Sequence, residues 1–350
     1  MVCISPLVSL MVDQQSKFSP KGLSTEYVGE AQPDLAVKRK VLNGDVQLVY
    51  ISPECLIMNK TYRSMLLSPQ YQQNLVALVI DEAHCVKTWG DSFRKAFAEI
   101  GDLRSIIPSS VNVLALTATA TKETYDVIVK RLSLENPTVV ALPPFRNNIS
   151  YSVQPKVDVH ILGEMLYQEL KAKRTSFPKT ILYVRTYTDC SNLYMVLKRK
   201  MGSEITEPPG CPNVSGYRLI DMFNRALTEG KKEVLSMFGG KDTSLRLVIA
   251  TTAFGMGVDI EDVQRIMHWG MPSILEEYVN GTGMCDRDGE ASQAILYQGK
   301  HTAYTTLKVK NYADNTSLCR RRLLFRDFLL YCEDDTHVIG SKSCDWVIAQ

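Results

Sequence analysis

The fold is decided by LVALVIDEAHC, residues Leu75–Cys85. An apolar run the length of a buried strand delivers two carboxylates, Asp81 and Glu82, to its carboxyl end. Strands that alternate with helices predict a parallel α/β sheet with ligand sites at the strand ends. Helix-length segments separate the strand candidates along most of the chain. The clearest strand candidates are Val2–Ser5, Val46–Ile51, Ala77–Ile80, Val113–Leu116, Thr180–Val184, Leu245–Ala250 and Arg265–His268.

Composition allows a globular protein of two domains. The chain has 350 residues, of which 45% are hydrophobic and 22% charged, and these values are typical of globular domains. The longest apolar runs are strand-sized, so no membrane-spanning helix is expected. A net charge of +2 neither requires nor excludes nucleic acid. Nine cysteines without a C-x-x-C pair indicate free thiols in a reducing compartment.

The string DEAH carries the first chemistry. In ATPases of the P-loop type, the first acid at such a strand end holds Mg²⁺ and the second polarises the attacking water. Asp81 and Glu82 are candidates for these roles, and His84 follows where it could sense the γ-phosphate side. A D-E pair alone is common at a polar turn, whereas the full string after an apolar strand is more specific.

A second polar strand end follows at LALTATAT, residues Leu114–Thr121. Its hydroxyls, Thr117 and Thr119, are expected to hydrogen-bond the DEAH acids and so link hydrolysis to movement between domains. A Thr-rich strand end alone is usually an edge or a helix cap. One helical segment and one strand separate it from DEAH, and this spacing favours the functional interpretation.

DEAH, TAT and a second α/β half together resemble superfamily 2 helicases. The stretch DEAHCVKTWGDSFRKAF resembles the aromatic-rich loop of the RecQ family of DNA helicases. The resemblance implies that Trp89, Phe93 and Arg94 sense single-stranded DNA and couple it to ATP hydrolysis. Aromatic rings and an arginine suit stacking on bases, although a buried Trp and Phe in an ordinary loop would read alike.

Two upstream segments also resemble RecQ motifs, and both would place amides and hydroxyls against DNA phosphates. The first is ISPLVSLMVDQ, with Ser5 and Pro6, and the second is ISPE, with Ser52. FRNNI (Phe145–Ile149) resembles the segment that joins the two domains of that family.

The strongest single match is VIATTAFGMGVDIEDVQRIMHWG, residues Val248–Gly270. The resemblance implies that Thr251 and Thr252 face DNA or the domain interface. Gly255 and Gly257 permit a tight backbone turn, and with Asp259 they would line the second wall of the ATP site.

Two motifs depart from the family pattern around ATP. No G-x-x-x-x-G-K-[ST] string occurs in the 350 residues, and such a string cradles the β- and γ-phosphates. We therefore expect a fragment or an incomplete gene model, with a gap in the first sheet. YVNGTGMCDRDG (Tyr278–Gly289) resembles the arginine-finger motif, but Asn280 replaces Gln and Met284 replaces the first arginine. Arg287 is the remaining catalytic arginine, so the change predicts weak hydrolysis.

The last departure concerns zinc. CRRRLLF (Cys319–Phe325) resembles the start of the family's zinc-binding subdomain, with Cys319 and Cys344 as two candidate Zn²⁺ ligands. Structural zinc needs four N or S ligands, and Cys332 and His337 stand at irregular spacing. Arg320–Arg322 is otherwise interpreted as a solvated basic face or a phosphate contact.

These observations predict two RecA-like α/β domains in tandem with a short helical remnant of a zinc module. The expected domains are residues 1–143, without P-loop strand and helix, residues 151–299, and a partial zinc-binding subdomain at 300–350. The resemblance implies an ATP- and Mg²⁺-dependent 3′-to-5′ DNA helicase of recombination and repair, with single-stranded and forked DNA as partners and a nuclear location. The alternatives are a nucleic-acid-binding remnant that does not hydrolyse ATP and an RNA helicase of the DEAH type.

Overall fold

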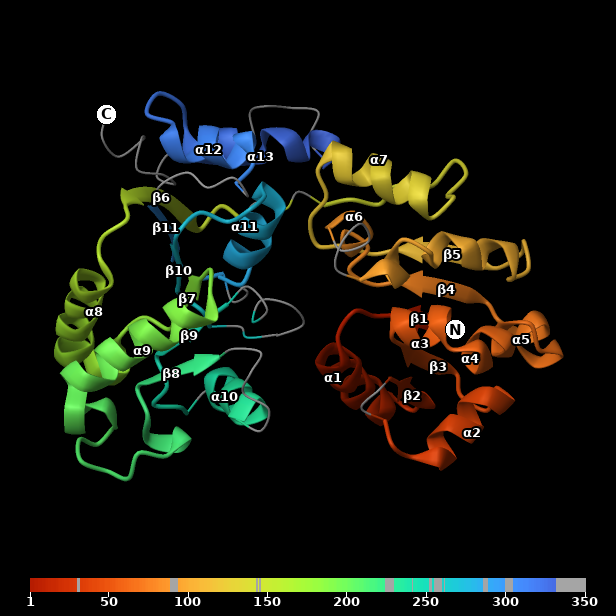
Figure 1. Ribbon diagram of the computed structural model, residues 1–350, viewed down its shortest axis with the longest axis horizontal. Coiled ribbons are helices and arrows are strands. Elements are labelled where there is room, and N and C mark those ends of the chain that lie inside the picture. Colours follow the sequence, from red (N-terminus) through yellow and green to blue (C-terminus); the bar gives the residue numbers. More distant parts are fainter. Residues whose placement is uncertain are drawn as a thin grey trace. The chain divides into compact units, whose positions relative to one another are not determined.

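A computed structural model gives the fold of residues 1–29, 32–88, 94–142, 144, 146–223, 230–240, 242–251, 254, 260, 262–285, 289–299 and 305–331. The chain divides into two compact units, Met1–Leu142 and Pro143–Gln350. Each unit is built on one parallel β-sheet with helices between the strands, in the order shown in Figure 1. The prediction of two parallel α/β domains is therefore confirmed.

The sheet of the first unit has five strands in the order β2-β3-β1-β4-β5. Its strands are β1 (Val2–Ile4), β2 (Thr25–Val28), β3 (Leu48–Ile51), β4 (Ala77–Ile80) and β5 (Asn112–Ala115). Strand β1 lies in the centre, with Val2 opposite Val49 of β3 and Leu78 of β4. The acids that follow β4 therefore sit at the carboxyl end of an interior strand.

The expected gap in this sheet is absent among the described strands, because all five pair with one another in an unbroken order. Strand β5 forms one end of the sheet instead. Its alternate residues Val113 and Ala115 pack against the core, whereas Leu114 is 42% and Leu116 48% exposed. The unpaired edge that the sequence predicted is therefore at β5 rather than in the middle of the sheet.

The helices of the first unit are short, and several have polar N-caps. Asp34, Ser52, Asn59 and Thr121 each accept a hydrogen bond from a backbone N–H of the first turn, which satisfies a donor that the helix leaves free. The helices are α1 (Val8–Phe18), α2 (Leu35–Asn43), α3 (Pro53–Met58), α4 (Lys60–Leu66), α5 (Pro69–Asn74), α6 (Cys85–Thr88) and α7 (Lys122–Arg131), with 3₁₀ turns at Ser19–Lys21, Lys95–Phe97 and Ile100–Ser105.

The sheet of the second unit has six strands in the order β6-β11-β10-β7-β9-β8, all parallel. The strands are β6 (Ile149–Pro155), β7 (Thr180–Val184), β8 (Ile220–Phe223), β9 (Leu247–Ala250), β10 (Arg265–Trp269) and β11 (Ser292–Gln298). The helices are α8 (Val159–Lys173), α9 (Tyr187–Met201), α10 (Gly230–Gly239), α11 (Leu275–Thr282), α12 (Leu307–Asp314) and α13 (Arg320–Phe325). Turns of 3₁₀ helix cover Arg174–Ser176, Gly202–Ile205, Ser215–Tyr217 and Arg326–Tyr331.

Both faces of this second sheet are buried, as expected for a parallel sheet between helices. Successive residues of a strand point to opposite faces. Ile181 and Tyr183 of β7 therefore join one apolar core with α10, α11 and the C-terminal helices, while Leu182 and Val184 join another with α8 and α9. Helices α12 and α13 lie at the β6–β11 end of the sheet (Figure 1).

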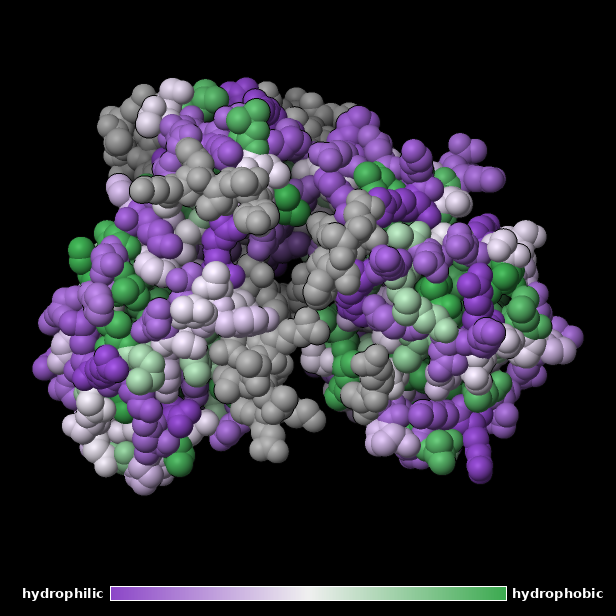
Figure 2. Space-filling model, viewed as in Figure 1, coloured by the Kyte–Doolittle hydropathy of each residue, from purple (hydrophilic) through white to green (hydrophobic). Residues whose placement is uncertain are grey.

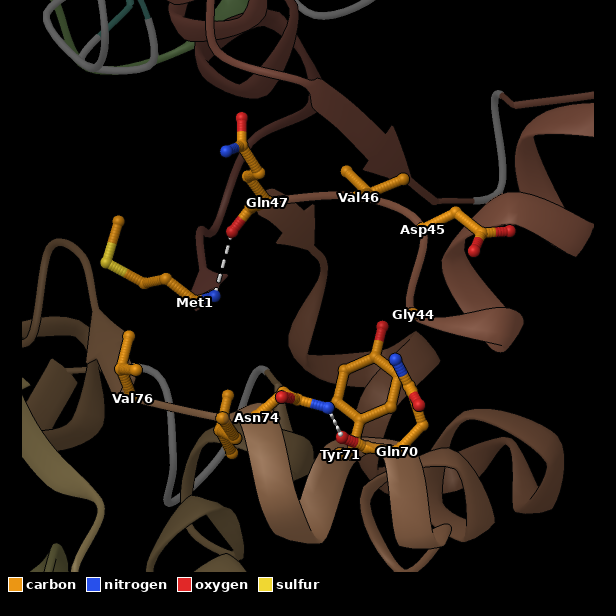
Figure 3. Close-up of a pocket in the computed structure, with 10 residues that line it drawn as sticks. Met1, Gly44, Asp45, Val46, Gln47, Gln70, Tyr71, Asn74 and Val76 are labelled. Atoms are coloured by element: carbon orange, nitrogen blue, oxygen red, sulfur yellow. Dashed lines mark hydrogen bonds between the residues drawn. The ribbon is translucent and has the colours of Figure 1, made fainter.

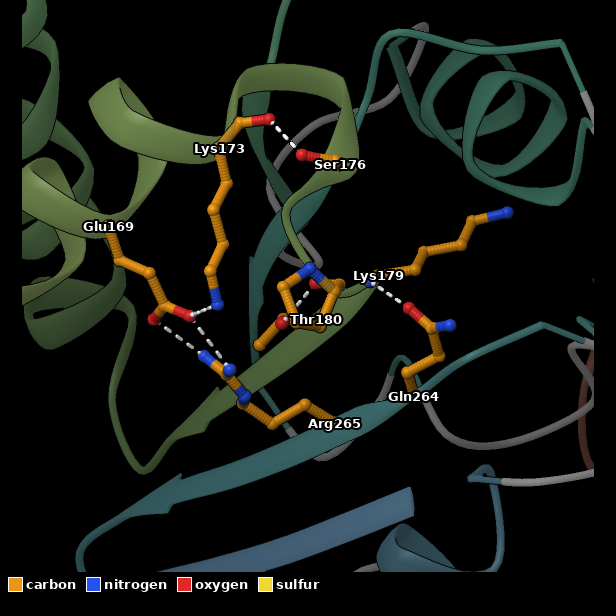
Figure 4. Close-up of polar contacts among 8 residues, drawn as sticks. Glu169, Lys173, Ser176, Lys179, Thr180, Gln264 and Arg265 are labelled. Carbon is orange, nitrogen blue, oxygen red and sulfur yellow. Dashed lines mark hydrogen bonds and ion pairs between the residues drawn. The ribbon is translucent and has the colours of Figure 1, made fainter. Parts of the chain in front are cut away.

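Ion pairs fix the amino end of the second sheet (Figure 4). The Arg265 guanidinium donates to both carboxylate oxygens of Glu169 at 2.9 Å, and Lys173 donates to the same carboxylate at 2.8 Å. Lys179, only 1% exposed, pairs with Asp262 at 2.6 Å. These contacts tie α8 to β10 and the start of β7 to the turn before β10.

The surface is mixed in character. Hydrophobic side chains reach the visible face of both units, scattered among hydrophilic ones (Figure 2). Among the residues that the structure describes, no helix has the length and apolar character needed to cross a membrane.

Candidate functional site

The DEAH acids lie where β4 turns toward the end of β5. The backbone N–H of Asp81 donates to the Ile4 carbonyl at 2.9 Å, and that of Ala83 donates to the Leu116 carbonyl at 2.8 Å. Between them Glu82 has a φ of 49°. Positive φ is uncommon for a residue with a β-carbon and often marks a functional turn. The turn aims two acids at one strand end.

Asp81 is the candidate Mg²⁺ ligand. Its Oδ1 accepts from the Glu82 N–H at 3.0 Å, and the Ser5 hydroxyl donates to Oδ2 at 3.4 Å. Burial, and then the neighbouring charge of Glu82, raise the pKa of this carboxyl. Both effects penalise the anion, and a cation bound at Asp81 would relieve both. Carboxylate and hydroxyl oxygens are donors that Mg²⁺ accepts, so the donor set fits that ion.

His84 joins Glu82 to the segment after β5. Its Nδ1 lies 3.1 Å from Thr117 Oγ1 and 3.2 Å from Glu82 Oε2. The Thr117 hydroxyl donates to the Thr119 carbonyl at 3.0 Å, so its oxygen accepts from His84. This network assigns the ring proton to Nδ1 and leaves Nε2 as the acceptor for the Cys85 thiol at 3.8 Å.

The expected contact between Thr117 and the acids is therefore indirect. The threonine hydroxyl reaches the imidazole, and the imidazole reaches Glu82. His84 is 6% and Thr119 5% exposed, so the link runs through a mostly buried polar cluster. The link between the DEAH acid and the TAT segment thus runs through one side chain.

Arg94 joins three of the sequence motifs. Its guanidinium donates to Glu54 through Nε at 2.6 Å and through a second nitrogen, and to the Pro6 carbonyl at 2.7 Å. Burial alone would raise the pKa of Glu54, but the hydrogen bond from Arg94 and the contacts with the backbone hold that pKa below its usual value. In this structure Arg94 contacts the protein itself, whereas Trp89 and Phe93 lie outside the described residues.

The upstream motif residues are buried. Ser5, Pro6 and Ser52 lie below the surface, with Ser5 donating to Asp81 and Ser52 accepting from the Cys55 N–H as the cap of α3. Their hydroxyls are thus engaged within the first unit. A contact of these residues with DNA phosphates stays a prediction.

In the second unit the structure describes only part of the predicted site. Thr251 follows β9 and is 8% exposed. The other predicted residues lie outside the described part of the chain, namely Thr252, Gly255, Gly257, Asp259 and Arg287. Their roles stay predictions.

Met284 is a core residue. It is 1% exposed and belongs to the apolar cluster beneath β6 and β10, together with Tyr151 and Tyr278. Asn280, one turn earlier in α11, is only partly buried. The position that holds an arginine in the resembling motif is therefore occupied here by a packed apolar side chain.

The arginines after Cys319 correct the sequence interpretation. Arg320 is 8% exposed and Arg321 0% exposed, so two of the three do not form a solvated face. Spacing could have revealed this, because Arg321, Leu324 and Phe325 share one helical face, and the last two are plainly apolar.

The zinc module is not confirmed. Cys319 caps α13 by position and packs against the apolar core, while Cys332, His337 and Cys344 lie outside the described residues. Within the described ranges no cluster of three or more His, Cys, Asp or Glu side chains could hold a metal ion. Zinc binding stays a prediction.

A pocket of about 350 Å³ opens at the opposite end of the first sheet (Figure 3). Met1, Gln47 and Val76 line it, and each immediately precedes or begins the approach to a strand. The Met1 amino group donates to the Gln47 carbonyl at 2.8 Å. Because ligand sites of parallel sheets lie at the carboxyl ends of strands, this pocket is separate from the DEAH site.

Comparison with known proteins agrees with this geometry. Residues 1–127 match the DEAD/DEAH box helicase family, and residues 161–289 match the helicase conserved C-terminal domain. Among solved structures, yeast (S. cerevisiae) Dbp5 bound to RNA and ADP BeF3 aligns over 90% of this chain and 75% of its own, with a TM-score of 0.66 and 16% identity. Mss116p aligns over 96% of this chain and 67% of its own, with a TM-score of 0.65 and 15% identity. The fold is thus that of tandem RecA-like helicase domains.

Sequence relatives narrow the class. ATP-dependent DNA helicase hus2/rqh1 of Schizosaccharomyces pombe is 29% identical over 95% of this chain and 24% of its own length. RecQ-like DNA helicase blm-1 of Caenorhabditis elegans is 26% identical over 98% of this chain and 36% of its own. ATP-dependent DNA helicase RecQ of Haemophilus influenzae is 27% identical over 84% and 44%. The chain belongs to the RecQ family of helicases, and it spans from a quarter to less than half of these relatives.

Proposed function

We propose that this chain contributes the motor core of an ATP- and Mg²⁺-dependent DNA helicase of the RecQ type. The observation that carries the proposal is the cluster at the end of β4, where Asp81 and Glu82 meet His84 and Thr117. An acid pair at an interior strand end, joined through an imidazole to the next strand, suits nucleotide hydrolysis that is coupled to movement.

The roles follow from the contacts. Asp81 would hold Mg²⁺, which when bound neutralises charge on the phosphates. Glu82 would orient and polarise the attacking water, and the hydrogen bond from His84 Nδ1 fixes its carboxylate. Arg287, with Gly255, Gly257 and Asp259, would contribute from the second unit.

The proposed partners are single-stranded and forked DNA, unwound in the 3′-to-5′ direction. Support comes from the relatives, which are named as DNA helicases. Arg94 supports coupling, because it joins the aromatic-rich loop to Pro6 and Glu54, which belong to the two motifs proposed to contact DNA. We place the protein in the nucleus on the strength of the family alone, and imaging of the tagged protein in cells tests this location.

The experiment is DNA-stimulated ATP hydrolysis by the 350-residue chain, with strand displacement on a duplex that has a 3′ tail. Glu82→Gln should lower the stimulated rate by about 10²-fold or more, because it removes the acid that polarises water. Glu135→Gln is the matched control, since Glu135 is exposed and distant in sequence from the DEAH string. Equal rates for wild type and Glu82→Gln would refute the assignment, and a stronger response to RNA would favour an RNA helicase.

A second function is a DNA-binding protein without turnover. It is favoured by Met284, whose buried apolar side chain occupies the position of a transition-state arginine. Such an arginine contributes about 10³-fold or more in rate. Fluorescence anisotropy with labelled single-stranded DNA, run beside the ATPase assay, separates the two: binding without stimulated hydrolysis supports this second function.

A further inference from the structure

The first described residues of β6 and the segment before it contact two other parts of the second unit in alternation. The side chains of Arg146 and Asn148 reach toward β11 and the turn before it. The intervening residue, Asn147, and the following residue, Ile149, contact Arg321 of α13. In extended chain, successive residues face opposite ways, so one short segment serves both sides.

On one side, the segment holds both flanks of the residues 286–288. The Arg146 guanidinium donates to the Cys285 carbonyl at 2.9 Å, and the Asn148 amide donates to the Glu290 carbonyl at 2.7 Å. The Ser292 N–H donates back to the Asn148 carbonyl at 3.0 Å. Arg287, the remaining arginine of the proposed catalytic motif, lies between these two anchored carbonyls in sequence.

On the other side, one buried guanidinium holds the segment itself. Arg321 is 0% exposed and donates to Asn147 Oδ1 at 3.0 Å, to the Asn147 carbonyl at 3.2 Å and to the Ile149 carbonyl at 2.6 Å. Its guanidinium carbon also lies 6.0 Å from the centre of the Tyr151 ring. Charged donors make stronger hydrogen bonds than neutral ones, and the planar fork fixes their directions.

We propose that Arg146, Asn148 and Arg321 are positioning residues for the Arg287 loop. Helix α13 holds the segment Arg146–Ile149 through Arg321, and this segment holds Cys285 and Glu290. The C-terminal helices would thereby support the part of the second unit that delivers the catalytic arginine. The inference deepens the proposed function and rests on it for the role of Arg287, while the mechanical link rests on the contacts alone.

Hydrogen–deuterium exchange of the intact chain tests the link without nucleotide or DNA. In Asn148→Ala and Arg146→Ala, amides of residues 286–290 should exchange about 3- to 10-fold faster, which is the loss of one hydrogen bond from the loop's support. Peptides from β7 and β9 should exchange as in wild type. Arg146→Lys keeps a donor and should recover part of the protection.

Arg321→Lys extends the test to α13. It retains the charge but loses the fork, so exchange should accelerate at residues 146–149 and also at 286–290. Asn315→Ala is the matched control, because the Asn315 amide likewise donates to a carbonyl, that of Leu318 at 2.6 Å, at an exposed site of the same unit. It should leave residues 286–290 unchanged.

The outcomes are decisive in both directions. Unchanged exchange at 286–290 in the Arg146, Asn148 and Arg321 variants would overturn the proposal, as would equal acceleration over the whole sheet, which indicates a general structural role. Wild-type protein without DNA-stimulated ATPase activity would instead count against the proposed function. A local acceleration in that same protein would still establish the link.

Discussion

The outer strands of the two sheets differ in what covers them. Strand β5 of the first unit leaves Leu114 42% and Leu116 48% exposed. Strand β6 of the second unit keeps Ile149 and Tyr151 at 2% each, with the Phe325 ring of α13 packed edge-on against Tyr151 at 6.1 Å. Both strands are partly apolar, so composition alone does not decide whether an end strand is buried. The elements that pack on it decide.

Cover in the second unit brings polar groups into the interior. Arg321 is enclosed where α13 meets β6, Lys179 lies buried at the start of β7, and His268 lies within β10. Arg321 and Lys179 have internal hydrogen-bond acceptors, as buried charges require. The first unit instead gathers its polar side chains at the ends of β4 and β5.

The largest expected effect comes from a matched pair of truncations at the two end strands. Phe325→Ala should lower the free energy of unfolding by about 3–5 kcal/mol, because it leaves a cavity beside Tyr151. Leu114→Ala should change it by less than about 0.5 kcal/mol, because that side chain is largely in water already. Urea unfolding of the intact chain, followed by circular dichroism, measures both. Equal losses would mean that β5 is covered as well as β6.

Met284 allows a second test of the apolar interior. Met284→Arg should destabilise the protein by about 3 kcal/mol, because a charge would enter a core that is 1% exposed at this position. Met284→Leu keeps the volume and should cost less than about 1.5 kcal/mol. Thermal unfolding compares the two variants. A stable Met284→Arg protein with faster ATP hydrolysis would show that the site accepts an arginine finger after all.

Sequence reasoning predicted the parallel sheets and the strand end that carries Asp81 and Glu82, because both depend on local pattern. An apolar run that ends in two acids specifies its own geometry at the end of β4. The bridge through His84 was not foreseen in this form, since the choice of Thr117 as its partner depends on the turn at Glu82.

Long-range contacts explain the failures. The triple arginine after Cys319 was interpreted as a basic face, yet Arg321 is buried by acceptors that lie 172 and 174 residues earlier in the chain. Likewise, Met284 was compared with an arginine by motif position, whereas its burial depends on β6 and α12. Neither fact is encoded in neighbouring residues.

His268 provides a pH test of the buried polar interior. It lies against Tyr183 and Tyr278, with ring centroids at 4.9 and 5.0 Å, and burial lowers its pKa from 6.5 to about 3. The unfolded chain therefore binds a proton that the folded chain refuses between pH 6.5 and 3. This group should cost about 2 kcal/mol of stability at pH 5 relative to neutral pH.

His268→Phe should flatten that dependence, because the ring is retained and the titration is removed. Urea midpoints between pH 7 and pH 5 measure the change. His160→Phe is the control, since His160 is intermediate in exposure on α8, where the titrating ring is in contact with solvent. A wild-type slope that persists in His268→Phe would assign the acid sensitivity to other groups.

The smallest effect compares one ion pair from each unit. Hydrogen bonds from Arg265, and after the opposing effect of burial those from Lys173, lower the pKa of Glu169 to about 2. Because the folded pKa is depressed, the stabilisation is complete above about pH 4.5 and is lost as the pH falls through about 2. Glu169 is partly solvated, so after screening Glu169→Gln should cost only about 1 kcal/mol at pH 7.

The counterpart is Glu123→Gln in the first unit. Glu123 pairs with Lys87 at 3.0 Å, but its side chain is 63% exposed, so the substitution should change stability by less than about 0.5 kcal/mol at any pH. Urea unfolding at pH 7 and pH 3 measures both variants. The Glu169→Gln deficit should shrink at pH 3, since part of the wild-type stabilisation is then already lost. A deficit that stays constant with pH would mean that packing of the Glu169 side chain, rather than its charge, joins α8 to β10.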